Sequence, residues 1–414
     1  MILYTPIAHA ELRPVPANSA GAASIPRLFA IDIFRGLIMV WMALDHVRDF
    51  FSNLPFEPET LAQTYPILFA TRWITHFCAP MFFFLAGTGA YLYGRNRSPA
   101  EVRRFLWTRG LWLILLEFTL VGTAWTFQFP WGFFGVIWAL GASMIIMSLA
   151  VRLPLRWIAA LSILMIAGHN LLDGIRPQQL GWWAWLWKIL HARGGILLPL
   201  GIRQFVLFPL VPLVGVMAAG YAFGEVYRLD RTRRRKLIAQ IGLALTLGFF
   251  LLRATNLYGN PPAGLGGVSQ GDFQVQPTLD KTIILFFDVE KYPPSLQFLL
   301  MTIGPSLLLL AALDRERVPR GAAALLTFGR VPMFFYVLHL YLIHSLAIVI
   351  AASTGQPVRW LFHGAIFGDT PDSYGYSLGM VYLMWVFTLL LLYFPCRWFA
   401  GLKQRRKDWW LSYL

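Results

Sequence analysis

Apolar runs longer than about 18 residues recur along the whole chain, and each is long enough to cross a bilayer as an α-helix. The chain has 414 residues, of which 57% are hydrophobic and only 13% are charged. Soluble domains are about a quarter charged, so charge is depleted here by about half. Inside lipid, a helix satisfies its own backbone hydrogen bonds. The sequence therefore predicts an all-α, polytopic integral membrane protein.

We expect about ten transmembrane helices in a single domain over residues 28–402. The predicted helices are 28–50, 66–94, 104–126, 131–151, 154–172, 203–226, 236–254, 295–313, 321–351 and 376–402. The second and ninth contain Pro80 and Pro332, which predict kinks or breaks. Residues 1–27 lack a compact apolar core with a cleavage site and are interpreted as an N-terminal tail. Residues 403–414 are expected to form a basic C-terminal tail.

The distribution of Lys and Arg orients the predicted helices. With the N-terminus in the cytoplasm, 19 Lys and Arg residues fall in or beside the cytoplasmic segments, against 7 in the much longer outer loops. Positive charge gathers on the cytoplasmic side of membrane proteins. We therefore expect both termini in the cytoplasm and a multi-pass location in the inner (cytoplasmic) membrane. The net charge of +15 then requires no nucleic-acid partner. The basic run at 228–236 is interpreted as a topology determinant touching anionic lipid, with nucleotide phosphates as the alternative ligand.

Three sizeable loops are predicted on the outer side, at 173–202, 255–294 and 352–375. The first contains GWWAWLWKIL (181–190), whose aromatic residues favour a helix lying at the membrane interface. The second contains GNPPAGLGGVSQGD (259–272), which we interpret as a flexible loop covering an external site. The two cysteines, Cys78 and Cys396, lie in apolar runs and offer neither a disulfide framework nor a metal-ligand spacing. No tightly bound metal, haem or flavin is expected.

The first predicted helix carries several ionisable residues, and such residues are costly inside a membrane. At 100° per residue, four of them fall within a stripe about 100° wide: Asp32, Arg35, His46 and Asp49. Arg35 and His46 are eleven residues apart, or about 16 Å along the axis. This stripe predicts one wall of a protein-lined cavity. An ion pair between Asp32 and Arg35 is the structural alternative, and Asp45 and Arg48 are expected to be boundary residues that point elsewhere.

Two later helices add residues of the same kind. Arg72 and His76 share a face of the second helix, at the depth predicted for His46 and Asp49, which suggests an acid/base site. The alternative is that these polar residues bind neighbouring helices together. In the ninth helix, His339 and Tyr336 share a face and are expected to line the site. The chain has no Walker, kinase or HExxH motif, so the templates of those soluble enzymes do not apply.

Several segments resemble the bacterial branch of the heparan-α-glucosaminide N-acetyltransferase-like membrane proteins. They are DIFRGL (32–37), RWITHFCAPMFFFLAGTGAYL (72–92), FGVIWALGASMI (134–145), LFPLVPLVGVMAAGYAFG (207–224), KYPPSLQFLLMTIGP (291–305) and FGRVPMFFYVLHLYLIH (328–344). The spacing of Arg35 and His46 is also similar to the arginine–histidine signature of the acyltransferase-3 membrane proteins. Both groups are regarded as transmembrane acyltransferases.

The resemblance implies transfer of an acetyl or other acyl group from cytoplasmic acyl-CoA, with acetyl-CoA as co-substrate, to a sugar or glycan on the outer side. Arg35 and His46 carry over by position. The lysosomal enzyme has its catalytic histidine in the loop between the first two helices, whereas residues 52–65 here contain none. It also has asparagine where this chain has His46. The acetyl-histidine mechanism and the acceptor therefore do not carry over.

Acyl transfer needs a base for the acceptor's proton and donors for the developing oxyanion. We expect His46 or His76 to be the base, Asp49 to orient His46, and Arg72 to be the donor. Arg35, with Asp32, His339 and Tyr336, is expected to bind the acyl-CoA. The alternative function is a transporter or flippase whose buried charges form a proton or substrate path. A homodimer is a further expectation.

Overall fold

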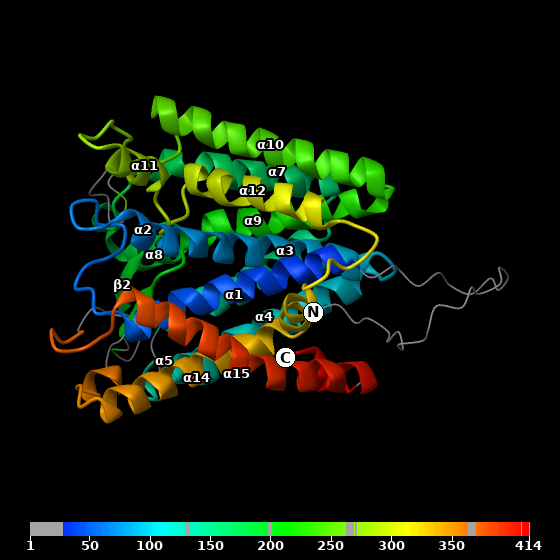
Figure 1. Cartoon of the computed structure of the whole chain (residues 1–414). Coiled ribbons are helices and arrows are strands. Elements are labelled where there is room, and N and C mark those ends of the chain that lie inside the picture. The colour runs from blue at the N-terminus through cyan, green and yellow to red at the C-terminus, as the bar shows by residue number, and fades with distance from the viewer. Residues whose placement is uncertain are drawn as a thin grey trace.

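Each of the ten predicted ranges contains helix in the computed structural model. It describes residues 28–128, 133–197, 201, 203–261, 269, 271–362, 370–406 and 408–413. The helices within the predicted ranges are α1 (Phe29–Phe51), α2 (Pro66–Trp73), α3 (Cys78–Gly94), α4 (Pro99–Leu116), α5 (Gly122–Thr126), α6 (Val136–Ala150), α7 (Leu155–Gly168), α9 (Leu210–Phe223), α10 (Arg231–Thr255), α12 (Leu296–Leu313), α13 (Ala323–Arg330), α14 (Pro332–Ser353) and α15 (Leu378–Arg405). They run roughly alongside one another as a bundle (Figure 1). Two more helices, α8 (Ala184–Leu190) and α11 (Leu279–Phe287), lie outside these ranges.

Eight helices in the described part of the chain are long and apolar enough to cross a membrane. They are Pro66–Gly94, Pro99–Thr126, Leu155–Leu172, Leu210–Arg228, Arg231–Thr255, Leu296–Leu313, Pro332–Ser353 and Leu378–Arg405. The other two predicted spans are helical as well. Helix α6 has 15 residues, and α1 has 23 residues but is interrupted by charged side chains. The prediction of an all-α, polytopic membrane protein is confirmed.

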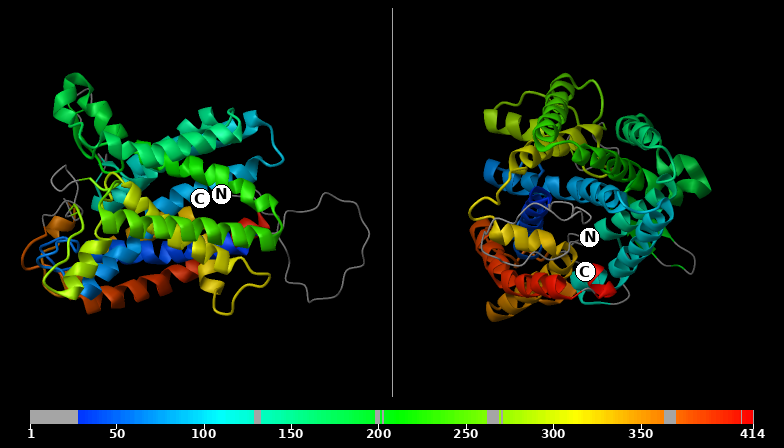
Figure 2. Two further views of the ribbon diagram at one scale, coloured as in Figure 1. Left: turned by 90° about the horizontal axis from the view of Figure 1, so that it is seen from above. Right: turned by 90° about the vertical axis from the view of Figure 1, so that its right-hand side faces the viewer.

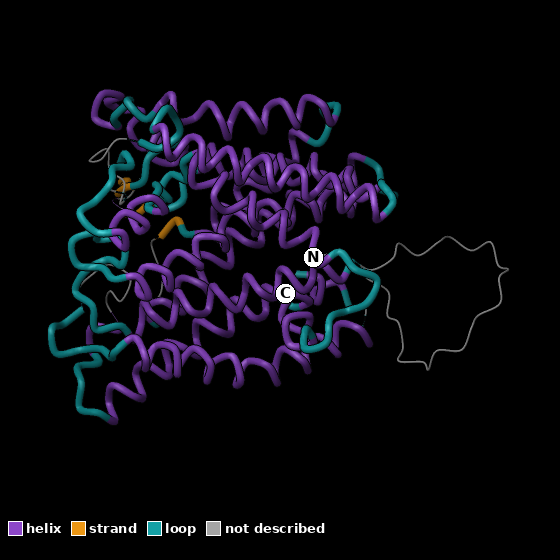
Figure 3. The backbone as a smooth tube through the Cα atoms, turned by 45° about the horizontal axis from the view of Figure 1, so that its top comes forward, coloured by secondary structure: helices purple, strands orange, loops and turns teal. Residues whose placement is uncertain are grey.

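Most of the loop backbone gathers at one end of the bundle (Figure 3), and the predicted outer loops lie at that end (Figure 1). We call it the loop end. Helix α1 begins and α15 ends at the opposite end, the terminal end (Figure 1). This arrangement agrees with an even number of crossings. Which end faces the cytoplasm stays a prediction.

Helix α1 runs through the middle of the bundle, packed against α3, α12, α13, α14 and α15 (Figure 1). Glycine allows the closest of these contacts. A Cβ atom on Gly36 would collide with the backbone of Leu325 in α13, and one on Gly329 would collide with the backbone of Asp32. Small residues let membrane helices approach in this way. The contact fixes α1 against the α13–α14 segment, which carries Tyr336 and His339.

Both predicted helix breaks are present. The second span changes to the 3₁₀ segment η1 (Ile74–Phe77) before α3 begins, because Pro80 cannot donate a hydrogen bond to the carbonyl four residues earlier. The ninth span breaks at Val331, directly before Pro332, which is the first residue of α14. The residue before a proline disfavours helical backbone angles.

Two predicted helices begin later than expected. In the range 131–151, Phe133 and Phe134 form a strand, and α6 starts only at Val136. The range 203–226 opens with a strand, and α9 starts only at Leu210, after Pro209. Strands β1 (Phe133–Phe134), β2 (Gly194–Leu197) and β3 (Arg203–Val206) form a small sheet in the order β1–β3–β2, with β1 parallel and β2 antiparallel to β3. The prediction of helix was therefore wrong for residues 203–209. The apolar run continues through them into α9, so hydrophobic periodicity alone does not separate the strand from the helix.

The aromatic segment of the first outer loop is helical, as predicted. It forms η4 (Pro177–Trp183) and α8, and it projects from the bundle at the loop end (Figure 2, left). Trp182 is 83% exposed and Trp183 is 61% exposed. The contact of these residues with a membrane interface stays a prediction. Most of the GNPPAGLGGVSQGD segment falls at residues 262–268 and 270, outside the described residues.

Candidate active site

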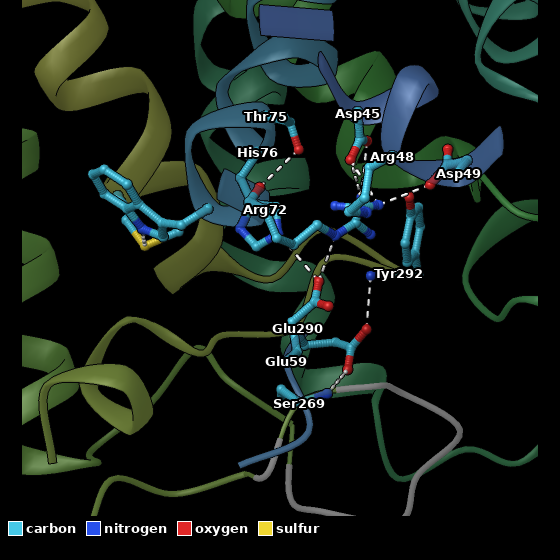
Figure 4. Close-up of polar contacts among 12 residues, drawn as sticks. Asp45, Arg48, Asp49, Glu59, Arg72, Thr75, His76, Ser269, Glu290 and Tyr292 are labelled. Carbon is cyan, nitrogen blue, oxygen red and sulfur yellow. Dashed lines mark hydrogen bonds and ion pairs between the residues drawn. The ribbon is translucent and has the colours of Figure 1, made fainter. Parts of the chain in front are cut away.

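A buried set of ion pairs joins the last turns of α1 to α2 and to the loop between them (Figure 4). Asp45 accepts two hydrogen bonds from Nη1 of Arg72, at 2.9 and 2.8 Å. Nε of Arg72 donates to Oε1 of Glu59 at 2.6 Å. Nη2 of Arg48 lies 2.8 Å from Oδ1 of Asp45 and 2.8 Å from Oδ1 of Asp49. We call these five residues the ion-pair network.

The network is stable only because its members satisfy one another. Removing a charge from water costs several kcal/mol, and this cost is offset where the charges are paired and hydrogen-bonded. Arg72 contacts two carboxylates, and Arg48 contacts two as well. Asp45 also lies within electrostatic range of Lys291, from the loop before α12. The guanidinium fork therefore holds α1, α2 and the loop in one fixed arrangement.

Glu59 is held in its ionised form. Burial by itself would raise the pKa of this carboxyl, but the charge of Arg72 and the hydrogen bond with His76 outweigh burial and hold the pKa well below its ordinary value. Nε2 of His76 lies 3.4 Å from Oε1 of Glu59, and its ring packs on Phe298 with 5.4 Å between ring centroids. His76 is therefore a partner of Glu59, at the end of the network far from His46.

His46 lies at the other end of the network. Its Nδ1 is 3.6 Å from Oδ2 of Asp49, which is too far for a hydrogen bond, and this nitrogen has no hydrogen-bond partner among the described residues. Its ring packs against Trp125 in α5 and His339 in α14, with centroid distances of 4.9 and 5.2 Å. One nitrogen is thus left available beside a carboxylate.

His339 continues the series of contacts toward the terminal end. Its Nδ1 lies 3.1 Å from the carbonyl oxygen of Phe335, which assigns the proton to Nδ1 and leaves Nε2 as an acceptor. The Tyr336 ring lies 5.4 Å from the His339 ring. His46, His339 and Tyr336 are therefore in sequential contact.

Tyr336 lines a cavity of about 160 Å³, which we call the terminal cavity because its lining includes Arg35, near the start of α1, and Tyr413, near the C-terminus. Its walls are apolar except for a few polar residues: Arg35, Arg109, Tyr336 and Tyr413. Lys403, from α15, lies within electrostatic range of both arginines. The terminal cavity therefore combines apolar walls with nearby cationic side chains.

Two of the predicted donor-binding residues, Arg35 and Tyr336, line the terminal cavity. His339 does not line this cavity itself, but its ring packs on Tyr336, which does. Asp32 takes another place: it is buried and lies 3.6 Å from Nη1 of Arg35, which also donates to the carbonyl of Gly329 at 3.1 Å. Asp32 therefore orients Arg35.

A second cavity, of about 590 Å³, lies at the loop end, and we call it the loop cavity. Its polar lining residues come from the first and second outer loops: Asp173, Arg176, Gln178, Gln179, Lys188, His191, Arg193, Glu290 and Tyr292. Oε1 and Oε2 of Glu290 accept hydrogen bonds from the backbone N–H groups of Tyr292 and Ser269, at 2.7 and 3.1 Å. Figure 4 shows Tyr292 beside Arg48 and Asp49. Tyr292 therefore lies both in the lining of the loop cavity and next to the ion-pair network.

Asp45 and Arg48 correct the sequence interpretation. We expected boundary residues, but Arg48 is only 6% exposed, and both form the centre of the ion-pair network. The reason is tertiary. The 52–65 loop and α2 fold back over the last turn of α1, so the face that a helical wheel assigns to solvent receives Arg72.

Glu59 was not predicted as a site residue from the sequence. It lies in a short irregular loop, where helical periodicity gives no signal, and an isolated glutamate there is ordinarily solvated. The same holds for His191 and Glu290. Glu117, left without a role, accepts a hydrogen bond from the backbone N–H of Trp138 at 2.8 Å and caps α6. Arg253 donates to backbone carbonyls of the second outer loop and fastens that loop to α10.

One protein family matches more than half of the chain. Its description is "Heparan-alpha-glucosaminide N-acetyltransferase, catalytic", and the match covers residues 27–252. This range includes Arg35, His46 and the whole ion-pair network. No curated protein matches the chain.

Proposed function

Since the chain belongs to the heparan-α-glucosaminide N-acetyltransferase catalytic family, we propose that it transfers an acetyl group from cytoplasmic acetyl-CoA to a sugar or glycan on the outer side of the inner membrane. The observation that carries this proposal is the position of His46. It lies between the two cavities: its ring packs on His339, which contacts Tyr336 of the terminal cavity, and Asp49 lies beside both His46 and Tyr292 of the loop cavity. An acyltransferase that works across a membrane needs a base between its donor side and its acceptor side.

The terminal cavity suits the acyl donor. Its apolar walls fit an acyl chain and the pantetheine arm, and the cations near it suit the phosphates of coenzyme A. Arg35, oriented by Asp32, is assigned to the pantetheine or phosphate portion. Tyr336 and His339 lie toward His46 and are assigned to the thioester end. With the terminal end in the cytoplasm, the donor enters from the side where acyl-CoA is made.

His46 is assigned as the general base. The acceptor's oxygen or nitrogen attacks the thioester carbonyl, and its proton passes to Nδ1 of His46, beside the Asp49 carboxylate. The new C–O or C–N bond forms as the C–S bond breaks, and the proton is returned to the leaving sulfur, which gives the free thiol. A positioned base of this kind contributes about 10²- to 10⁴-fold in rate.

Three assignments change from the sequence prediction. Arg72 uses Nε and Nη1 on carboxylates, so we propose that it positions the network instead of binding the oxyanion. Nη1 of Arg48, by contrast, is buried without a hydrogen-bond partner among the described residues. We propose this group as the oxyanion donor. His76, bound to Glu59, is proposed as a positioning residue.

The test is transfer of label from radiolabelled acetyl-CoA to an envelope extract by the purified protein. We expect His46→Ala to lose about 10²-fold or more and Arg48→Lys to lose rate without loss of donor binding. His344→Ala is the matched control, because its ring faces Ala124 and Phe127. Each variant is first checked for intact folding by size-exclusion chromatography. Unchanged transfer by His46→Ala would remove His46 from the proposal. Proteoliposome transport without any transfer would favour the transporter alternative.

A further inference from the structure

Two buried histidines lie next to each other at the base of the first outer loop. His169 begins the 3₁₀ segment η3 (His169–Leu172), directly after α7, and His191 directly follows α8. Their ring centroids are 5.7 Å apart, and the two residues are 2% and 3% exposed. The chain between them forms η4 and α8, which project from the bundle (Figure 2, left). The histidine pair therefore joins the two ends of the projecting segment.

Each ring uses one of its nitrogens on an acceptor of the protein. Nδ1 of His169 lies 3.1 and 3.0 Å from the carbonyl oxygens of Met165 and Ile166, which assigns the proton to Nδ1. Nε2 of His191 lies 3.0 Å from Oδ1 of Asp173, which assigns the proton to Nε2. The second nitrogen of each neutral ring then carries a lone pair. Neither of these nitrogens has a hydrogen-bond partner among the described residues.

This pattern is typical of histidines that bind a metal ion. A metal-bound imidazole donates its other N–H to a backbone carbonyl or a carboxylate, which fixes the tautomer and the orientation of the ring. His169 has the carbonyls, and His191 has the carboxylate. Two imidazoles on one tetrahedral Zn²⁺, with Zn–N bonds of about 2.0–2.1 Å, have ring centroids roughly 5 to 5.5 Å apart. The observed 5.7 Å needs only a small adjustment of the side chains.

Asp173 connects the pair to the helical bundle. Its Oδ2 accepts a hydrogen bond from the side-chain amide of Asn170 at 2.8 Å. Oδ1 of Asn170 in turn accepts from the backbone N–H of Leu296, the first residue of α12, at 2.9 Å. The carboxylate that orients His191 is thus itself held in place, so Asp173 is a positioning residue for the pair.

We propose that His169 and His191 together bind a divalent metal ion that favours imidazole, such as Zn²⁺ or Cu²⁺. In the part of the chain that the structure describes, no three His, Cys, Asp or Glu side chains are arranged to hold a metal ion. Water or a small ligand from the loop cavity, which His191 lines, therefore completes the coordination. The ion is exchangeable, and it clips the two ends of the projecting segment together. This inference does not depend on the proposed function.

Metal titration of the purified full-length protein, without a histidine tag and stripped with a chelator, tests the inference. Binding of Cu²⁺ is followed by electron paramagnetic resonance and binding of Zn²⁺ by calorimetry. We expect one ion per chain and a copper signal from two imidazole nitrogens. Asp173→Asn should weaken binding by about 10- to 100-fold, and His169→Ala and His191→Ala at least as much. His344→Ala is the matched control, because His344 is also buried with one ring nitrogen unpartnered among the described residues.

Limited trypsin digestion tests the clip itself. Zn²⁺ should slow cleavage after Lys188 and Arg193, on either side of His191, in the wild type but not in His169→Ala. The copper signal of the wild type decides the question even where a variant fails to fold. A signal from one imidazole, no binding, or equal binding by the wild type and both alanine variants would overturn the proposal and leave the pair as the site of a buried water. Acetyl transfer enters none of these measurements, so failure of the proposed function leaves them valid.

Discussion

Replacement of Arg72 by Met tests how the ion-pair network is held together. This substitution keeps an unbranched apolar stem but removes the guanidinium and its three hydrogen bonds, two to Asp45 and one to Glu59. Removal of one member of a buried ion pair costs about 3–5 kcal/mol, because the opposite charge stays buried without compensation. We expect the free energy of unfolding to fall by about that amount.

The structure also indicates which carboxylate loses its strongest partner when Arg72 is replaced. Without Arg72, Asp45 keeps Arg48 at 2.8 Å, whereas Glu59 keeps His76 at 3.4 Å. Glu59 is therefore the charge left without a strong partner. Adding Glu59→Gln to Arg72→Met should recover about 1–3 kcal/mol, and adding Asp45→Asn should recover less.

Unfolding in mixed detergent micelles, followed by circular dichroism, measures these differences. Arg72→Lys serves as the control that retains one positive charge but loses the planar fork. We expect it to lie between the wild type and Arg72→Met. If Asp45→Asn rescues Arg72→Met as well as Glu59→Gln does, the assignment of the orphaned charge is refuted.

Three further predictions concern pH, packing and catalysis. Because the folded-state pKa of Glu59 is lowered, its contribution to stability is complete above the unfolded-state pKa of about 4.3 and is lost as the pH falls from there toward the folded-state pKa. The difference in melting temperature between wild type and Glu59→Gln should therefore shrink below about pH 4, and a constant difference would contradict the ion-pair assignment. Gly36→Leu should separate α1 from α13 and lower the melting temperature, whereas Gly89→Leu, which has open space at its Cβ position, should change it far less; equal losses would argue against the close contact. Asp49→Asn should lower the acetyl-transfer kcat and leave the acetyl-CoA KM near its wild-type value, as measured by steady-state kinetics; a change in KM alone would assign Asp49 to binding.

Hydrophobic length and charge were enough to predict the helical bundle. The apolar runs located all ten helical ranges, and prolines located both breaks. Both are local signals, because each affects the backbone only within a few residues along the chain. The strand at 203–206 was missed for a related reason. Its apolar run continues into α9, and its pairing with the nearby β2 and the distant β1 distinguishes it from helix. Pro209, directly before α9, was the local signal that the prediction did not use.

The site was predictable only where it follows a single helix face. Helical geometry brought Arg35 and His46 onto one stripe, and the structure has Arg35 at the terminal cavity and His46 beside His339. The same geometry misplaced Asp45, whose surroundings are set by α2 and by Glu59. The position of Asp45 depends on contacts between segments, and the sequence of one helix does not specify those contacts.

The position of His46 between two cavities has a consequence for membrane energetics. Under the proposed function, the acceptor loses its proton on the outer side, and the thiol of coenzyme A carries a proton away on the cytoplasmic side. The acetyl unit moves outward as the proton moves inward, so the charge on each side of the membrane is the same before and after a turnover. The membrane potential therefore does no net work on the reaction, whose driving force is the thioester itself. An ionophore that collapses the potential is expected to leave the extent of acetylation in intact vesicles unchanged.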